Sequence, residues 1–142
     1  DEFLPIPCQS PEVIAKTWLC PAVTQSLQEI GREWAKIHTD QPLRIGELSK
    51  EGGGKSPPHK SHQDGVDVDI GVMLINPRGQ KRPKVGEENY SQELTQELID
   101  FIVDKSIVPI DVIWFADPEV TNAMLRTKSD HRKHFHVRFL LP

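Results

Sequence analysis

Two segments that lie far apart in the sequence combine a strand-like alternation with clustered histidine and carboxylate side chains. The first begins at His59 and continues into an apolar stretch that ends at Leu74, and the second runs from His131 to Leu140. Together they hold five of the six histidines. Side chains alternate between the two faces of a strand, so each segment can send polar groups to one face and apolar groups to a core. We therefore expect two neighbouring strands that share a polar face.

This alternation selects which side chains can meet on that face. His134, His136 and Arg138 share one side of the last strand, while Asp67 and Asp69 share one side of the earlier strand. Pairing the two strands with their apolar sides inward places Asp69 and His136 on a common polar face. His62 stands in the loop just before the strand and can fold over the same point.

Hydrophobic periodicity predicts an α+β fold with a small, mostly antiparallel four-stranded sheet and two main helices. The predicted helices cover residues 23–38 and 91–105, and the predicted strands cover 43–48, 66–74, 110–115 and 134–140. Short helices are expected around 11–18 and 117–126. We interpret residues 1–142 as a single domain in which residues 1–22 form an N-terminal strap.

Composition narrows the class of partner. The chain has 142 residues and a formal net charge of -4, without the basic stripe that a nucleic-acid groove needs. It also lacks an apolar run of the ~20 residues that a membrane span requires. The first residue is Asp1, which is compatible with removal of a signal peptide.

Cys8 and Cys20 are the two cysteines, and neither lies near the histidine clusters. A disulfide between them implies an oxidising compartment. A straight helix from residue 10 to 19 would be ~13 Å long, whereas bridged Cα atoms lie within ~7 Å. Either the helix is short and the chain doubles back, or the thiols are free and buried; we favour the disulfide.

The polar face suggests metal chemistry. Two imidazoles and one carboxylate around a point leave a fourth position open, which is typical of catalytic zinc, although nitrogen and oxygen ligands also suit iron or manganese. Each histidine or aspartate taken alone is more often an ordinary surface or turn residue. Their concentration beside two alternating strands favours a metal site.

The spacing of these residues resembles a known family. His-x6-Asp followed by His-x-His is similar to the signature of the lysostaphin, D-Ala-D-Ala peptidase and hedgehog group of zinc peptidases. Within that group, Ser61-His62-Gln63, the segment 65–70 and the segment 131–138 look most like the penicillin-insensitive murein endopeptidases. That branch also has a histidine three residues before the first ligand, where His59 stands here.

The resemblance implies a peptidase fold of that group, one Zn²⁺ ion and a role for each matching residue. The implied zinc ligands are His62, Asp69 and His136. His134 is implied as a catalytic base or transition-state stabiliser, and His131 as a supporting catalytic histidine. His59 is either a ligand of a weakly bound or second metal ion, or a residue that contacts the metal ligands or the substrate. We prefer a contact to the metal ligands.

Two further residues of the polar face have alternative roles. Asp67 either orients an imidazole or is a solvated strand residue. Arg138 either binds a substrate carboxylate or forms a structural ion pair.

The resemblance therefore implies a zinc metallopeptidase that hydrolyses peptide cross-links of peptidoglycan, between D-alanine and meso-diaminopimelate, in the periplasm or after secretion. Peptidoglycan peptides are the expected partners, with an inhibitor protein if the enzyme is a delivered toxin. A D,D- or L,D-carboxypeptidase acting on stem peptides is the alternative enzyme. A non-catalytic zinc-bound recognition module is the alternative of another class.

Overall fold

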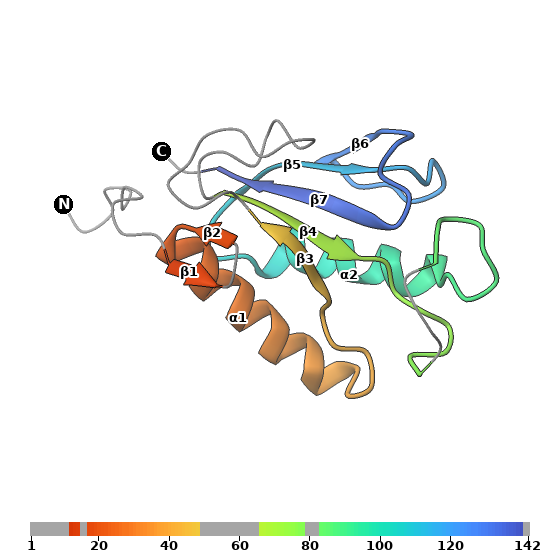
Figure 1. The fold of residues 1–142 in the computed structure, drawn as a ribbon, viewed down its shortest axis with the longest axis horizontal. Coiled ribbons are helices and arrows are strands. Elements are labelled where there is room, and N and C mark those ends of the chain that lie inside the picture. The colour runs from red at the N-terminus through yellow and green to blue at the C-terminus, as the bar shows by residue number, and fades with distance from the viewer. Residues whose placement is uncertain (1–11, 15–16, 49–65, 79–82, 141–142) are drawn as a thin grey trace.

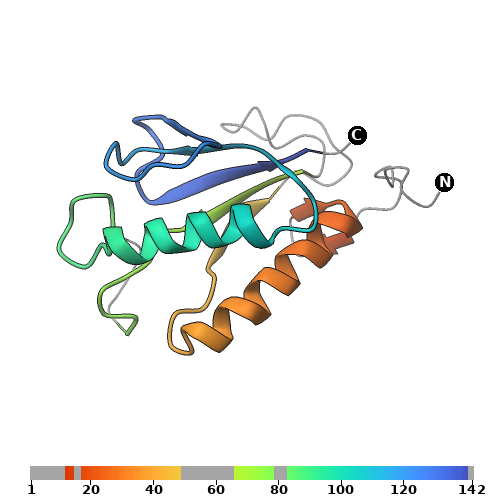
Figure 2. The same cartoon turned by 180° about the vertical axis from the view of Figure 1, so that it is seen from behind.

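The computed structural model describes residues 12–14, 17–48, 66–78 and 83–140 (Figures 1 and 2). Within these residues the fold is α+β, with two helices and a five-stranded mixed sheet in the order β3-β4-β7-β5-β6. The helices are α1 (Pro21–Ile37) and α2 (Gln92–Lys105), and the strands of the sheet are β3 (Ile45–Leu48), β4 (Asp67–Gly71), β5 (Ile110–Phe115), β6 (Leu125–Thr127) and β7 (His134–Phe139).

The centre of the sheet is the antiparallel pair of β4 and β7, which come from the two segments that carry the histidine and carboxylate clusters. In this pair Asp69 lies opposite His136 and Asp67 lies opposite Arg138. β5 flanks β7 on the other side, also antiparallel, and places Trp114 opposite His136. The predicted pairing of the two segments is therefore confirmed.

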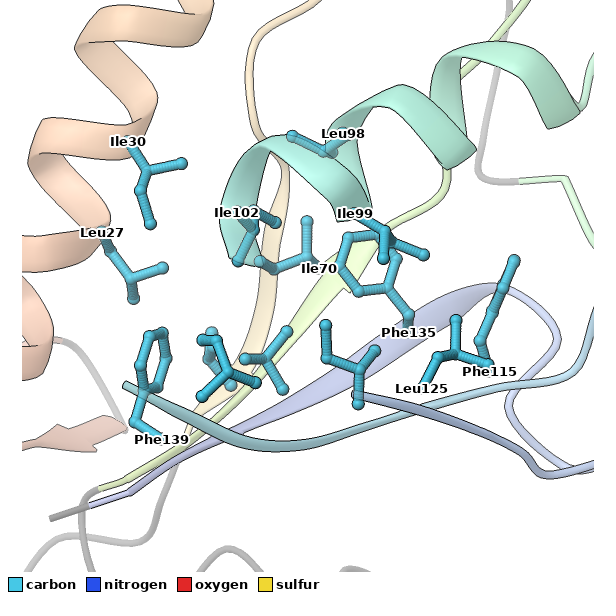
Figure 3. Packing of buried hydrophobic residues seen from close by; sticks show 14 of the residues in the cluster. Leu27, Ile30, Ile70, Leu98, Ile99, Ile102, Phe115, Leu125, Phe135 and Phe139 are labelled. Carbon is cyan, nitrogen blue, oxygen red and sulfur yellow. The ribbon is translucent and has the colours of Figure 1, made fainter. Parts of the chain in front are cut away.

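Both helices pack against one face of this sheet (Figures 1 and 2). In the core, Leu27 and Ile30 of α1 and Ile102 of α2 point toward the aromatic and branched side chains of the strands, among them Phe135 and Phe139 (Figure 3). The residues of β7 that alternate with these belong to the opposite face. The helices therefore leave the polar face of β4 and β7 to the other side of the sheet.

The helix boundaries follow from local chemistry. Pro21 stands at the start of α1, where its missing N–H costs nothing, and Ser91 caps α2 by accepting the N–H of Leu94. Ile37 is 55% exposed because it lies in the last turn of α1, beyond the core. Of the helices in the described part of the chain, none is long and apolar enough to cross a membrane.

The predicted four-stranded sheet is wrong in number, because the segment expected as a short helix around 117–126 ends in a fifth strand. The Asp117 carboxylate accepts the N–H of Glu119, and the Asn122 side chain accepts the N–H of Met124. These bonds hold the backbone in turns. The chain then runs parallel to β5 as β6, which makes the sheet mixed.

The N-terminal helix expected around 11–18 is also wrong. Residues 12–14 (β1, Glu12–Ile14) and 17–19 (β2, Thr17–Leu19) form a separate two-stranded antiparallel sheet. The segment is rich in β-branched and aromatic residues, which favour strands. Cys20 follows directly and is disulfide-bonded, while Cys8, the other cysteine of the sequence, lies outside the described residues.

Candidate metal and catalytic centre

The centre is built around a contact between Asp69 and His136. Asp69 Oδ1 lies 3.1 Å from His136 Nδ1, and each residue is only 1% exposed. They are direct neighbours across β4 and β7, so the strand register itself brings them together. Asp67 and Asp69 of β4, which the alternation predicted to share a polar face, are both buried. The polar side chains on this face of the sheet are therefore buried inside the protein.

Asp67 holds the other side of the same imidazole. Its Oδ1 accepts a hydrogen bond from His136 Nε2 at 2.8 Å and from Arg138 Nε at 3.1 Å. A carboxylate can only accept, so Nε2 carries a proton and donates it to Asp67. Of the two roles open to Asp67, orientation of an imidazole matches this contact, and Arg138 is in an ion pair with Asp67.

The protonation of His136 reflects these two carboxylates. Burial by itself lowers the pKa of the imidazole, but the hydrogen bonds to Asp67 and Asp69 outweigh it, and the pKa of His136 is raised. Positive charge is therefore favoured at the point between Nδ1 and Asp69. A proton supplies that charge in the protein alone, and a metal cation would supply it in the same place.

His134 approaches the second oxygen of the same carboxylate. Its Nε2 lies 3.4 Å from Asp69 Oδ2, and its side chain is partly exposed. Because His134 and His136 are two residues apart on one strand, they present both imidazoles to Asp69. His134 is the more accessible of the two, which suits a group that contacts a substrate or water.

His131 lies against both of these imidazoles. Its ring centroid is 5.9 Å from that of His134 and 5.8 Å from that of His136, with near-perpendicular planes. Its Nδ1 is 2.8 Å from Asp130 Oδ1. Burial lowers the pKa of His131 more than Asp130 raises it, so the imidazole is held neutral near pH 7. The role of Asp130 as the partner of His131 was not predicted from the sequence.

Backbone hydrogen bonds and a buried polar network fix the loop that carries His131. The His131 carbonyl accepts the N–H of Ala116 at 2.9 Å. Asp117, the residue after Ala116, is buried and accepts hydrogen bonds from the Tyr90 hydroxyl at 2.6 Å and from the Gln92 side-chain amide at 3.0 Å. Burial alone would raise the pKa of Asp117, but these hydrogen bonds and the N–H of Glu119 lower it overall.

Trp114 forms the edge of the centre on β5. The centroid of the Trp114 ring is 5.0 Å from that of the His136 ring, and the Arg138 guanidinium lies 5.4 Å from the Trp114 centroid. Trp114 was not predicted as a residue of the site, although the alternation of β5 carries the signal. Ile113 and Phe115 are buried in the core, so Trp114 between them must face the other side.

Within the residues that the structure describes, no group of three or more His, Cys, Asp or Glu side chains is arranged to hold a metal ion. His62, the third ligand predicted from the sequence, lies outside the described residues. His59 lies outside them as well. The donor chemistry of the described part still fits a metal. His136 Nδ1 and Asp69 Oδ1 face one another, and the Nε2–H of His136 is bound by a carboxylate, as in most histidine metal ligands.

A carboxylate and imidazoles gathered on a buried sheet face define a centre suited to metal-assisted hydrolysis. The family model of the penicillin-insensitive murein endopeptidase matches residues 13–107, which is more than half of the chain. The chain belongs to this family of metallopeptidases. The matched range contains the first cluster and ends before His131 and β7. No individual protein of curated function is similar enough in sequence to match.

Proposed function

We propose that this protein is a zinc-dependent peptidoglycan hydrolase that cleaves the peptide cross-link between D-alanine and meso-diaminopimelate. Membership in the murein endopeptidase family supports the substrate class. The observation that carries the chemistry is the buried chain Asp67–His136–Asp69, in which one imidazole is bound by a carboxylate at each nitrogen. Burial of two carboxylates is costly unless cations neutralise them.

In this proposal Asp69 and His136 hold the metal together with His62, and Asp67 fixes the ring of His136. A Zn²⁺ ion bound there would polarise the scissile carbonyl and lower the pKa of a water molecule to about 7. Nitrogen and oxygen donors are also compatible with iron or manganese. Metal analysis of the purified protein therefore tests whether the bound ion is zinc.

His134 and His131 supply the proton chemistry. His134 stands beside Asp69 and is partly exposed, so it can take a proton from the attacking water or donate a hydrogen bond to the developing oxyanion. His131, held neutral and bound to Asp130, supports His134 from the side and can accept a proton in turn. Both lie outside the set of proposed ligands.

The reaction is the hydrolysis of one amide bond. The oxygen of water bonds to the D-alanyl carbonyl carbon, and the carbon–nitrogen bond breaks. One proton of the water reaches the leaving amine of diaminopimelate, through His134 in our proposal, and the D-alanyl carboxylic acid releases the other. The products are two peptides in place of one cross-link, with no oxidant or reductant required.

A substrate in the cell wall places the protein in the periplasm or outside the cell, and we propose that it acts there on peptidoglycan peptides. The disulfide at Cys20 is in keeping with an oxidising compartment. An inhibitor protein is an expected partner if the chain is a delivered toxin. We further propose that residues 1–142 act as one domain.

Digestion of purified murein tests the proposal. The products are separated and identified by mass spectrometry, with and without a chelator. Loss of cross-linked dimers and a matching gain of monomers indicate endopeptidase activity. Trimming of terminal alanines without loss of dimers would instead indicate the carboxypeptidase. Bound zinc with no change in any muropeptide would indicate the recognition module.

A further inference from the structure

A second cation lies on Trp114, next to the candidate centre. Lys128 Nζ is 5.6 Å from the centroid of the Trp114 ring, which also contacts the ring of His136 at 5.0 Å and the guanidinium of Arg138 at 5.4 Å. Lys128 follows the end of β6, and its backbone N–H donates to the carbonyl of Phe115, the last residue of β5, at 2.7 Å. This bond fixes the start of the lysine side chain beside the strand that carries Trp114.

The two cations on Trp114 differ in what they bind. Arg138 is committed to Asp67 through its Nε at 3.1 Å. Lys128 is exposed and, within the part of the chain that the structure describes, forms no ion pair with a carboxylate. An ammonium on a flexible stem, resting on an aromatic face and lacking a carboxylate partner, is suited to take an anion from a bound molecule.

Lys128 lies beside the candidate centre through Trp114. The Trp114 ring contacts Lys128 Nζ at 5.6 Å and the ring of His136 at 5.0 Å, so the ammonium and a proposed metal ligand share one indole. Asp130, two residues further along the chain, is itself bound to His131. Lys128 is thus placed to contact a group bound at the centre.

We propose that Lys128, supported by Trp114, is a specificity-determining residue that binds the substrate carboxylate on the carbon attached to the scissile nitrogen. The inference rests on the proposed function and adds one contact between this protein and the proposed substrate. In the D-alanyl–meso-diaminopimelate cross-link, the carbon bearing the scissile nitrogen carries a carboxylate. A terminal D-alanyl-D-alanine offers the same group at the same place, so both sources present the same chemistry to Lys128.

The contact serves binding more than the chemical step. The carboxylate bears the same charge before and during hydrolysis, so its attraction to Lys128 is equal in the ground state and the transition state. Such an interaction lowers KM and leaves kcat nearly unchanged. This distinguishes Lys128 from His134, whose loss is expected to lower kcat.

The test uses matched cross-linked muropeptide dimers in which this carboxylate is either free or converted to a primary amide. A third substrate, a monomeric stem peptide ending in D-alanyl-D-alanine, separates the two sources of the carboxylate. Lys128→Met removes the charge and keeps an apolar stem on Trp114, and Lys128→Arg restores a cation. Lys105→Met, at the far end of α2, is the control for loss of an exposed lysine.

The wild type is expected to cleave the free-acid dimer with a kcat/KM about threefold to tenfold above that of the amide, as for a partly exposed charge contact. Lys128→Met is expected to abolish this preference by raising KM on the acid alone, while Lys128→Arg and Lys105→Met keep it. The same preference in Lys128→Met as in the wild type would overturn the inference, with hydrolysis itself intact. A wild type that cleaves none of the three substrates would overturn the proposed function and this contact with it.

Discussion

His136 Nε2 lies 2.8 Å from Asp67 Oδ1, and both side chains are buried almost completely. This hydrogen bond decides which nitrogen of the imidazole carries a proton, and it leaves Nδ1 directed at Asp69. It also explains why a strand with two aspartates can pass through the interior. Each carboxylate has a cationic or proton-donating neighbour on β7.

We expect Asp67→Asn to lower metal affinity and activity by about tenfold to a hundredfold, the range seen when the hydrogen-bond partner of a metal-bound histidine is lost. The amide can present its NH₂ group to Nε2 and so no longer specifies the tautomer. Metal content and kcat/KM on a cross-linked muropeptide measure the effect. Asp111→Asn, an exposed aspartate on β5, is the control. Unchanged metal content and rate in Asp67→Asn would exclude the positioning role.

Replacement of the two histidines of β7 should have different consequences. His136→Ala removes a proposed ligand and is expected to abolish metal binding and hydrolysis together, as is His62→Ala. His134→Ala is expected to retain the metal and lose rate by about a hundredfold or more, because a proton-transfer group is lost. Metal analysis of each purified variant alongside its kcat separates the two roles. Loss of the metal in His134→Ala would instead make His134 a ligand.

The network at Asp117 predicts stability that depends on acid pH. The folded protein holds the pKa of Asp117 below its ordinary value, so the unfolded chain binds the proton more tightly. The stabilisation is therefore present above the unfolded pKa of about 4 and is lost as the pH falls through the lower pKa of the folded state. We expect Asp117→Asn to reduce the free energy of unfolding by about 1–3 kcal/mol at pH 7, and by less in acid.

Urea denaturation of both proteins between pH 7 and pH 3 measures this difference. Tyr90→Phe, which removes one hydrogen bond from the same carboxylate, should cost about 1 kcal/mol. Asp100→Asn, an exposed aspartate on α2, is the comparison for loss of a charge. A difference between wild type and Asp117→Asn that stays constant over this pH range would show that ionisation of Asp117 does not stabilise the fold.

Much of the site could be anticipated because strand alternation is a local property. Each strand fixes which side chains share a face, and this was enough to bring Asp69 and His136 together on a shared face. Pairing partners on other strands depend on register and sheet order, which alternation does not encode. For that reason Trp114 and Lys128, which reach the centre from β5 and from the end of β6, were missed.

The fold was predicted least well where short polar side chains compete with helix formation. The segment after β5 contains Asp117 and Asn122, which bind backbone N–H groups and hold turns. The helical pattern there was too short to outweigh them. The long helices were predicted well because several buried residues at helical spacing agree, as Val23, Leu27 and Ile30 do in α1.

The core beneath the centre should be sensitive to truncation. Phe135 is fully buried between the two centre residues of β7, and its ring packs edge-on against Phe115 at 6.0 Å. We expect Phe135→Ala to lower the free energy of unfolding by about 3–5 kcal/mol. Ile75→Ala, at an exposed apolar position, should change it by less than about 0.5 kcal/mol. Equal effects in thermal or urea unfolding would contradict the packing described for β7.

The most direct test of the central claim is digestion of purified cross-linked dimer by the protein as prepared, after chelation, and after Zn²⁺ is added back. We predict cleavage to monomers, loss of cleavage with the chelator, and recovery of cleavage with one equivalent of zinc. His136→Ala should show no recovery at any zinc concentration. Cleavage that continues at full rate after complete metal removal would contradict the account.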